Sequence, residues 1–272
     1  MKTLFLPLYR AKIAAGILSS QHKNLLRWLF RSNETTNFTY FLDDLSRQYL
    51  ANFVSGIFGV SYETVISYFE EIEKDSNFQN HIKTHTLKSE QKYKADTEVR
   101  LGRRIAWYAI IRILKPKVVI ETGIDKGLGS CLIANALLKN KAEGFPGNYY
   151  GTDINPKAGF LFQPPYSETG KVLYGDSIQS LEKFDQTIDL FISDSDHSDL
   201  YEAKEYEVIR EKMNQSGVII GDNSFQSPSL FQFCKKYGYR FHYFQEKTKN
   251  HWYQGEGLGV GLMPQFQATQ QV

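Results

Sequence analysis

The chain has 272 residues, about twice the usual size of a domain, so it can form one large domain or a core with an extension. Hydrophobic residues make up 42% of the chain and charged residues 23%, a composition that excludes a disordered or collagen-like protein. The 32 basic and 30 acidic side chains give a net charge of +2, which does not favour nucleic-acid binding. A partner therefore has to be inferred from a local site.

The spacing of the cysteines and the length of the apolar runs indicate in which cellular compartment the protein is expected. Cys131 and Cys234 lie far apart, without the spacing of a disulfide framework or a zinc site. No apolar run approaches the roughly 20 residues of a membrane span. The sequence therefore predicts a cytoplasmic protein with reduced thiols.

Residues 1–33 differ in charge from the rest of the chain. They hold six basic side chains and no acidic one, so this arm carries +6, and the remaining 26 basic and 30 acidic side chains give −4. Apolar side chains alternate with these charges, which is typical of a basic amphipathic helix. Such an arm can pack on its own protein, contact the partner of a homodimer, or lie at the periphery of an anionic membrane. A transit peptide is a further alternative, although the arm is poor in Arg and Ser.

Residues 40–95 are predicted to be mainly helical, and with the arm they form a helical N-terminal extension, residues 1–95. Ser61 can cap one of these helices. The polar stretch 75–95 is interpreted as a linker. A helix over 101–114 is predicted to follow it.

Short apolar runs then alternate with helical segments, and this alternation predicts a parallel sheet with right-handed crossovers. The predicted strands are 117–121, 148–153, 171–175, 188–194 and 217–222, with helices near 129–140, 177–183, 200–212 and 227–237. Residues 240–244 and 257–263 are predicted to form a hairpin that adds an antiparallel strand. The catalytic domain is thus expected over residues 96–264, followed by a polar tail, residues 265–272.

The first predicted strand leads through Glu121, Gly123, Gly127 and Gly129 into a helix. Glycines let the backbone turn tightly and approach a ligand at the helix N-terminus. The Gly-x3-Gly-x-Gly spacing differs from that of dinucleotide-binding and Walker A loops. The motif alone is therefore equally compatible with a simple strand–helix turn.

Acidic residues follow the next two predicted strands. Asp153 ends the second strand, where a carboxylate can accept hydrogen bonds from both hydroxyls of a ribose, and Asp176 follows the third, where it can reach an adenine amino group. Together with Glu121, they indicate a pocket for an adenosine that carries a positively charged group and no phosphate. Asp176 can instead be only the N-cap of the next helix.

These motifs resemble those of the class I S-adenosylmethionine-dependent methyltransferases, over about residues 96–264. Glu121-x-Gly-x3-Gly-x-Gly matches their first motif, Asp153 their ribose-binding acid and Asp176 their adenine-side acid. The resemblance implies an α/β, Rossmann-like fold with a seven-stranded, mostly parallel sheet and an antiparallel last strand. It also implies that S-adenosyl-L-methionine is bound by Glu121, Thr122, Gly123, Gly127, Gly129, Ser130, Asp153, Ile154, Asp176, Ser177 and Asp194.

The fourth and fifth predicted strands bring Asp194, Asp222 and Asn223 toward one point, and such oxygen ligands suit Mg²⁺, Mn²⁺ or Ca²⁺. The set is similar to the ligands of cation-dependent O-methyltransferases of the catechol type, which implies a divalent cation held by these three residues. Those families often have Glu-Asp where this chain has Asp222-Asn223. Alternatively, Asp222 and Asn223 only turn the chain and Asp194 caps a helix.

His197 lies three residues after Asp194, so its imidazole can lie beside such an ion and accept the proton of an acceptor hydroxyl. Asp-Ser-Asp-His resembles an element of the metal-dependent sugar O-methyltransferases of macrolide pathways and of the cephalosporin hydroxylase/rhamnosyl O-methyltransferase group. The resemblance implies that His197 is the general base. His197 can also be structural, bonded to the following helix, and Asp196 has no evident role.

Sequence and resemblance together predict a cation-dependent O-methyltransferase that acts on a hydroxyl of a small-molecule or glycosyl acceptor, with no nucleic-acid partner. Aromatic side chains in the loop 250–255 can stack on the acceptor or simply pack within the hairpin. Two alternatives stay open: a metal-dependent glycosyltransferase that uses Asp194-Ser-Asp196, and a non-catalytic module that binds S-adenosylmethionine.

Overall fold

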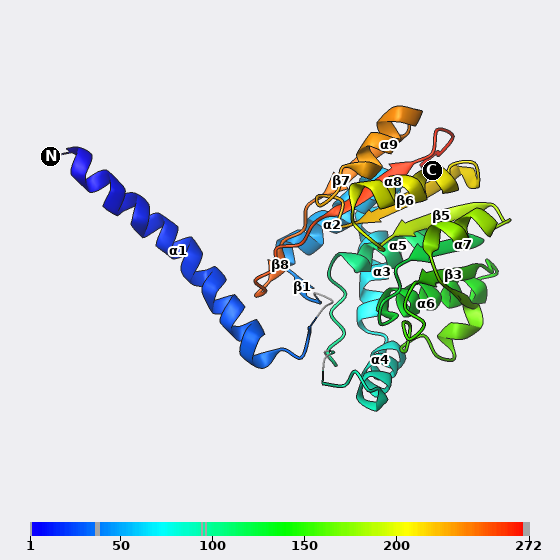
Figure 1. Ribbon diagram of the computed structural model, residues 1–272, viewed down its shortest axis with the longest axis horizontal. Helices are drawn as coiled ribbons and strands as arrows, with labels where there is room; N and C mark the ends of the chain where they lie inside the picture. Colours follow the sequence, from blue (N-terminus) through cyan, green and yellow to red (C-terminus); the bar gives the residue numbers. More distant parts are fainter. Residues whose placement is uncertain (1, 36–38, 94, 96, 269–272) are drawn as a thin grey trace.

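The computed structural model describes residues 2–35, 39–93, 95 and 97–268. Its centre is a seven-stranded sheet with the strand order β4-β3-β2-β5-β6-β9-β7 (Figure 1). The strands of this sheet are β2 (Val118–Thr122), β3 (Asn148–Asp153), β4 (Gly170–Tyr174), β5 (Ile188–Ser193), β6 (Met213–Asp222), β7 (Arg240–Phe244) and β9 (Leu258–Leu262).

Strand β9 lies antiparallel between β6 and β7, and the other strands of the sheet run in one direction. The predicted Rossmann-like α/β fold, with its antiparallel last strand, is therefore confirmed. Because the parallel strands end at the same edge, Thr122, Asp153, Ser193 and Asp222 end their strands along one side of the sheet. This edge is where a ligand is expected in an open parallel sheet.

Helices cover both faces of the sheet because neighbouring strand residues point to opposite sides. Leu190 and Ile192 enter an apolar core on the face of α5 and α6, whereas Phe191 enters a second core beneath α7, α8 and α9. These helices are α5 (Ile105–Leu114), α6 (Leu128–Ala142), α7 (Ser177–Lys183), α8 (Asp199–Ile209) and α9 (Ser229–Tyr237), with short 3-10 turns η1 (Gly102–Arg104) and η2 (Tyr166–Thr169).

The helices of the N-terminal extension share the core of α5 and α6. Val54, Phe58 and Phe69 are fully buried there. The Ser61 hydroxyl accepts a hydrogen bond from the Thr64 N–H at 3.1 Å, which confirms Ser61 as an N-cap. The helices are α2 (Asp44–Phe58), α3 (Tyr62–Glu73) and α4 (Ser76–Lys88).

The prediction of a linker over residues 75–95 is wrong for most of that stretch, because residues 76–88 form α4. The Asp75 carboxylate caps this helix by accepting from the Phe78 N–H at 2.9 Å. Phe78, Ile82 and Thr86 are buried and spaced four residues apart, so they form a narrow stripe on an otherwise polar helix. The predicted domain boundary at residue 96 lies outside the described residues.

Helix α1 (Lys2–Arg31) projects away from the sheet and its helices (Figure 1). Near its C-terminal end, the ring of Trp28 contacts the ring of Trp252, with centroids 5.3 Å apart. The predicted arm is thus helical, and along most of its length it does not pack on its own protein.

A second sheet joins β1 (Phe41–Leu42) to β8 (Thr248–Lys249) in antiparallel register. Strands of two residues leave no periodic pattern in a sequence, so they could not be predicted from it. This small sheet fixes the long connection between β7 and β9 to the N-terminal extension.

The remaining expectations concern the thiols and the C-terminal end. Cys131 and Cys234 are buried and free. Phe266, at the start of the expected polar tail, is buried with its ring 5.6 Å from that of Phe58. Residues 269–272 of that tail lie outside the described residues. In the part of the chain that the structure describes, none of the helices has the length and apolar character of a membrane span.

Candidate functional site

A cavity of about 620 Å³ lies at the edge where the parallel strands end. Its walls come from the glycine loop after β2, the segment after β5, the end of β6, η1 and the connection between β7 and β9. The lining residues are Arg103, Arg104, Gly123, Asp125, Asp194, His197, Asn223, Gln226, Trp252, Tyr253 and Glu256. Of the predicted site residues, the cavity therefore brings together Gly123, Asp194, His197 and Asn223.

The glycine loop passes too close to its neighbours to carry side chains. Gly123 has a φ of 78°, and a Cβ there would lie 2.1 Å from the carbonyl oxygen of Asp194. A Cβ at Gly129 would lie 2.2 Å from Oε1 of Glu121. Glycine at these two positions therefore lets the loop pack closely against the Asp194 backbone and the Glu121 side chain.

Glu121 lies beneath this loop and does not line the cavity. It is 1% exposed and accepts hydrogen bonds from the hydroxyls of Ser130, at 2.8 Å, and Tyr149. Burial raises the pKa of Glu121 to about 7, although these hydrogen bonds act in the opposite direction. Glu121 and Ser130 thus support the loop from below.

Glu205 forms a second buried cluster that the sequence analysis missed. Its carboxylate accepts hydrogen bonds from hydroxyls at or just after the ends of β2, β4 and β5: Thr122, Ser177, Ser193 and Ser195. Burial raises the pKa of Glu205. The predicted cofactor residues Thr122 and Ser177 therefore face Glu205, which holds the strand ends together.

The remaining predicted cofactor residues lie along the ends of β3 and β4. The Asp153 carboxylate accepts from the backbone N–H groups of Asp125, at 2.9 Å, and Asn155, at 2.8 Å, while Ile154 beside it is exposed. Asp176 is the N-cap of α7, since it accepts from the Gln179 N–H at 2.9 Å. Their contacts with a cofactor stay predictions.

Two arginines occupy the centre of the predicted cation site. Arg103 donates from Nε to Asp222 at 2.7 Å, and from Nη2 to both Asp222 and Asn223. Arg104 donates from Nη2 to Asp194 at 3.0 Å. Each of the three predicted ligands therefore has a guanidinium as its partner.

This donor set does not fit a divalent cation. Arg103 donates to both carboxylate oxygens of Asp222 and to the side-chain amide oxygen of Asn223. The atoms that would bind a metal therefore already bind a positively charged group. Among residues 2–35, 39–93, 95 and 97–268, no group of three or more His, Cys, Asp or Glu side chains is arranged to hold a metal. The predicted metal site at Asp194, Asp222 and Asn223 is thus not supported.

The buried charges explain how this centre is stabilised. Asp222 is completely buried, and its burial opposes ionisation, but Arg103 and Arg104 outweigh that effect and lower the pKa of Asp222. Burial and the neighbouring charge of Asp222 raise the pKa of Asp194 instead. Arg103 also donates from Nη1 to Glu246 at 2.8 Å. The cluster therefore compensates its charges internally.

His197 lies between α8 and the cavity. Its Nδ1 is 3.3 Å from a Glu202 oxygen, and its Nε2 is 2.9 Å from the Asn223 amide nitrogen. Burial acts to lower the pKa of His197, but the hydrogen bond to Glu202 and the nearby carboxylates, Asp194 among them, raise it above 6.5. His197 is therefore held between a carboxylate on α8 and the cavity wall.

The loop 250–255 contributes aromatic side chains to the cavity. Trp252 and Tyr253 line it, and the Tyr253 hydroxyl donates to the Asn223 amide oxygen at 3.2 Å. His251 points elsewhere, with its Nε2 3.3 Å from Glu34 and its ring beside Tyr40. Stacking of these aromatic side chains on the acceptor stays a prediction.

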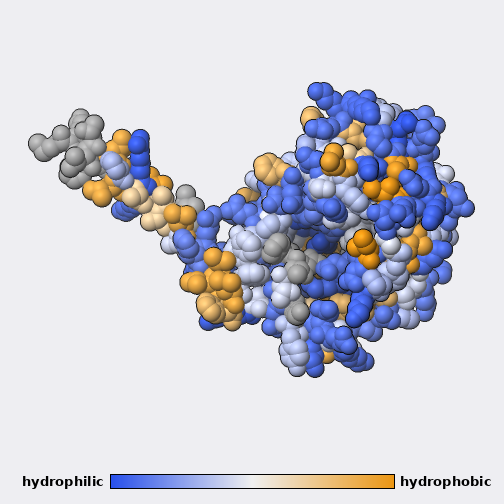
Figure 2. Space-filling model, viewed as in Figure 1, coloured by the Kyte–Doolittle hydropathy of each residue, from blue (hydrophilic) through white to orange (hydrophobic). Residues whose placement is uncertain are grey.

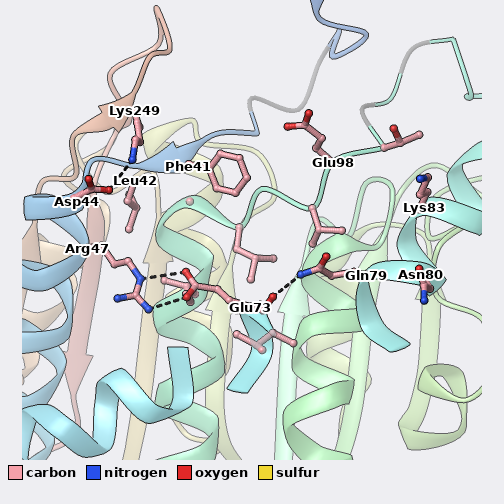
Figure 3. Close-up of a pocket in the computed structure, with 16 residues that line it drawn as sticks. Phe41, Leu42, Asp44, Arg47, Glu73, Gln79, Asn80, Lys83, Glu98 and Lys249 are labelled. Atoms are coloured by element: carbon pink, nitrogen blue, oxygen red, sulfur yellow. Dashed lines mark hydrogen bonds and ion pairs between the residues drawn. The ribbon is translucent and has the colours of Figure 1, made fainter. Parts of the chain in front are cut away.

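A second hollow, of about 650 Å³, lies away from the strand ends between β1, α2, α4 and the segment before η1 (Figure 3). Its charged side chains bind one another: Arg47 forms a two-point pair with Glu73, and Lys249 bonds to Asp44 at 2.7 Å (Figure 3). Because these partners neutralise one another, this hollow presents no group comparable to His197 of the cavity at the strand ends.

Arg103, Arg104 and Glu202 are the functional candidates that the sequence analysis missed. One signal pointed to the arginines, because they directly precede an almost entirely apolar segment, Ile105–Leu114. Lone charged residues in such a segment usually pair with other buried groups. The sequence did not indicate which groups those would be.

Comparisons with known proteins agree with the architecture. A family model described as a methyltransferase domain matches residues 120–224. The SAH-bound methyltransferase PaMTH1 of Podospora anserina is 16% identical over 74% of this chain and 94% of that chain, with a TM-score of 0.52. The O-methyltransferase TomG of Streptomyces achromogenes, in complex with SAM, is 11% identical over 70% of this chain and 90% of that chain, with a TM-score of 0.50.

No curated protein sequence matches the chain. The family model covers the glycine loop, Asp153, Asp194, His197 and the end of β6. The two solved structures have a similar fold although their sequences are only distantly similar to this chain. The chain therefore has the class I methyltransferase fold, and its residues 120–224 match the model of a methyltransferase domain.

Proposed function

We propose that the protein is an S-adenosylmethionine-dependent O-methyltransferase that acts on a hydroxyl of a small-molecule or glycosyl acceptor. The observation that carries the proposal is the position of His197 in the cavity wall, with Glu202 at Nδ1 and the exchangeable Asn223 amide at Nε2. A general base needs this combination of an orienting partner and access to the acceptor.

The cofactor fits the side of the cavity formed by the glycine loop. The missing Cβ of Gly123 lets the loop pass close to the Asp194 backbone at the cavity wall, and Asp153 lies directly behind the loop. When bound, S-adenosylmethionine supplies an electrophilic methyl group on a positively charged sulfur, which leaves as a neutral thioether. Asp153 would accept hydrogen bonds from the ribose hydroxyls.

His197 accepts the proton of the acceptor hydroxyl. The acceptor hydroxyl replaces the Asn223 amide as the partner of Nε2, so that the oxygen can form its bond to the methyl carbon while the proton moves to the imidazole. Glu202 stabilises the imidazolium that results. Arg104, whose guanidinium borders the cavity, favours the partial negative charge on the reacting oxygen.

The proposal includes no divalent cation, because guanidinium groups engage the three oxygen donors that the sequence suggested for one. Without chelation, the acceptor does not need two adjacent oxygens. Trp252 and Tyr253 on the cavity wall favour an acceptor with a flat apolar face, such as a sugar ring or an aromatic ring.

The glycosyltransferase alternative depends on Asp194 and Asp196 acting together. Asp194 is bonded to Arg104, whereas Asp196 accepts from the Ser198 N–H at 2.9 Å in an exposed turn. This divergence favours methyl transfer.

Calorimetric titration of the purified protein with S-adenosylmethionine tests the proposal, followed by incubation with a labelled methyl donor and a panel of sugars and phenols. Binding together with labelled product supports an O-methyltransferase. Binding without any product in the panel favours the non-catalytic module, and absence of binding contradicts the proposal. S-adenosylhomocysteine serves as the positive control for a folded cofactor site.

A further inference from the structure

Helix α1 presents apolar side chains to solvent along most of its length. Leu8 is 68% exposed and Phe30 is 80% exposed. Figure 2 shows hydrophobic surface along the projecting helix. The exposed apolar residues described in α1 are Leu6, Leu8, Tyr9, Ile13, Leu18, Leu26, Leu29 and Phe30. A contiguous surface of this kind marks a site of contact with another partner.

The apolar side chains are not confined to one seam. At about 100° per residue, Leu6 and Ile13 fall on one side of the helix, whereas Leu18 and Leu29 fall nearly opposite. A single protein groove or a two-helix seam would cover only one of these sides. The distribution favours a partner that adapts to a broad apolar surface, as the headgroup and upper acyl region of a membrane does.

All charged side chains of α1 are basic. The helix holds six basic residues and no acidic one, and Lys23, Arg27 and Arg31 repeat every four residues along one stripe. Pairing two copies of this helix would bring twelve positive charges together without any acidic partner, and like charges destabilise helix pairs. A surface that carries negative charge would instead be attracted.

We propose that α1 binds the surface of an anionic phospholipid membrane, with its apolar side chains in the headgroup and upper acyl region and its basic side chains on the phosphates. The helix lies on the surface and does not span it. Each Lys or Arg near such a surface contributes a favourable electrostatic interaction, and buried Leu and Phe side chains add an apolar one.

The base of α1 ties this surface to the cavity. The ring of Trp28 contacts the ring of Trp252, which lines the cavity. The Nε1 of Trp28 donates to Glu34 at 3.2 Å. A membrane bound by α1 is therefore expected close to the loop 250–255. This proposal does not depend on the proposed reaction, because the membrane-binding residues lie outside the cavity.

Vesicle co-sedimentation of the full-length protein tests the proposal. The protein should sediment with vesicles of equal parts phosphatidylcholine and phosphatidylglycerol but not with pure phosphatidylcholine, and binding should fall at high ionic strength. The triple variant Lys12→Gln/Lys23→Gln/Arg27→Gln should bind about a hundred-fold more weakly, at roughly five-fold per charge. Leu8→Ser/Leu18→Ser/Leu29→Ser should also lose binding.

The matched control is Lys83→Gln/Lys88→Gln/Lys92→Gln, which removes the same charge from exposed positions of the body and should bind like the wild type. Cofactor binding by all variants reports that the body is folded. Failure of the wild type to bind anionic vesicles overturns the proposal. So does a dimer in light scattering that the leucine variant converts to a monomer, because a second copy would then be the partner of α1.

Discussion

The orientation of the Asn223 amide decides which nitrogen of His197 is available for chemistry. The amide oxygen accepts from Arg103 and from the Tyr253 hydroxyl, so the amide nitrogen must face Nε2 of His197. Nε2 then accepts, and the ring proton lies on Nδ1, toward Glu202. This is the tautomer that a general base needs, and buried neighbours fix it before any acceptor binds.

Replacement of His197 by Ala should lower kcat about 10²- to 10⁴-fold, because the acceptor hydroxyl loses its proton acceptor. The affinity for S-adenosylmethionine should stay nearly unchanged. Glu202→Gln, which keeps a hydrogen-bonding group but removes the charge, should lower kcat less. Steady-state kinetics and cofactor titration separate the effects, and a fully active His197→Ala variant would remove His197 from the mechanism.

Glu121 should make the stability of the protein depend on pH. Its pKa is raised from 4.5 to about 7 in the folded state, so the folded protein keeps this proton where the unfolded chain has lost it. Its contribution is therefore fully present below pH 4.5 and is lost as the pH rises through 7. The loss amounts to about 3 kcal/mol at 1.36 kcal/mol per pH unit.

Urea unfolding at pH 5 and pH 8 measures this effect by comparison with Glu121→Gln, which cannot ionise. The free energy of unfolding of the wild type should fall more between the two pH values than that of the variant. Equal falls would show that Glu121 has the same pKa in both states.

At the scale of single residues, sequence spacing found His197 and Asp194 but could not find their partners. Arg103 and Asp222 are 119 positions apart in the chain, and Arg104 and Asp194 are 90 apart. Local patterns report which residues share a turn or a strand end, whereas pairs of this kind depend on how η1 is placed against the sheet. The ligand set was therefore assigned to a metal, although arginines fill that position.

At the scale of elements, periodicity performed best where apolar residues are dense. The strands of the central sheet and helix α7 lie close to their predicted ranges, since buried strands read as continuous apolar runs. Helix α4 was missed because only three of its residues face the core. Strands β1 and β8 were missed because two residues carry no period.

Helix α7 offers a test of the role of Asp176. Asp176→Ala should lower the free energy of unfolding by about 1 kcal/mol, the usual cost of losing an N-cap, and Asp176→Asn should cost much less because Asn also caps. Thermal or urea unfolding measures both variants. Equal stability of the alanine variant and the wild type would contradict the capping role.

For the whole molecule, the charge-compensated centre predicts that stability does not depend on divalent cations. The unfolding midpoint in EDTA should equal that in added Mg²⁺ or Mn²⁺, because guanidinium groups already balance Asp194 and Asp222. A cation present at 100 times its dissociation constant would stabilise the protein by about 2.7 kcal/mol. If Mg²⁺ raised the stability of the wild type by that amount but did not stabilise the Asp194→Asn variant, the prediction of a metal site would be supported.

The connection between the N-terminal extension and the cavity sets where the chain can be shortened. Tyr40 donates to Glu246 at 2.8 Å and accepts from Arg103 at 2.6 Å, and Phe41 and Leu42 pair with β8. Removal of residues 2–31 should thus leave the body folded, with cofactor affinity close to that of the full chain. Ending the deletion at residue 42 would remove the Tyr40 hydroxyl from the buried arginine cluster and the whole of β1 from the small sheet. That shorter protein should unfold at a clearly lower urea concentration.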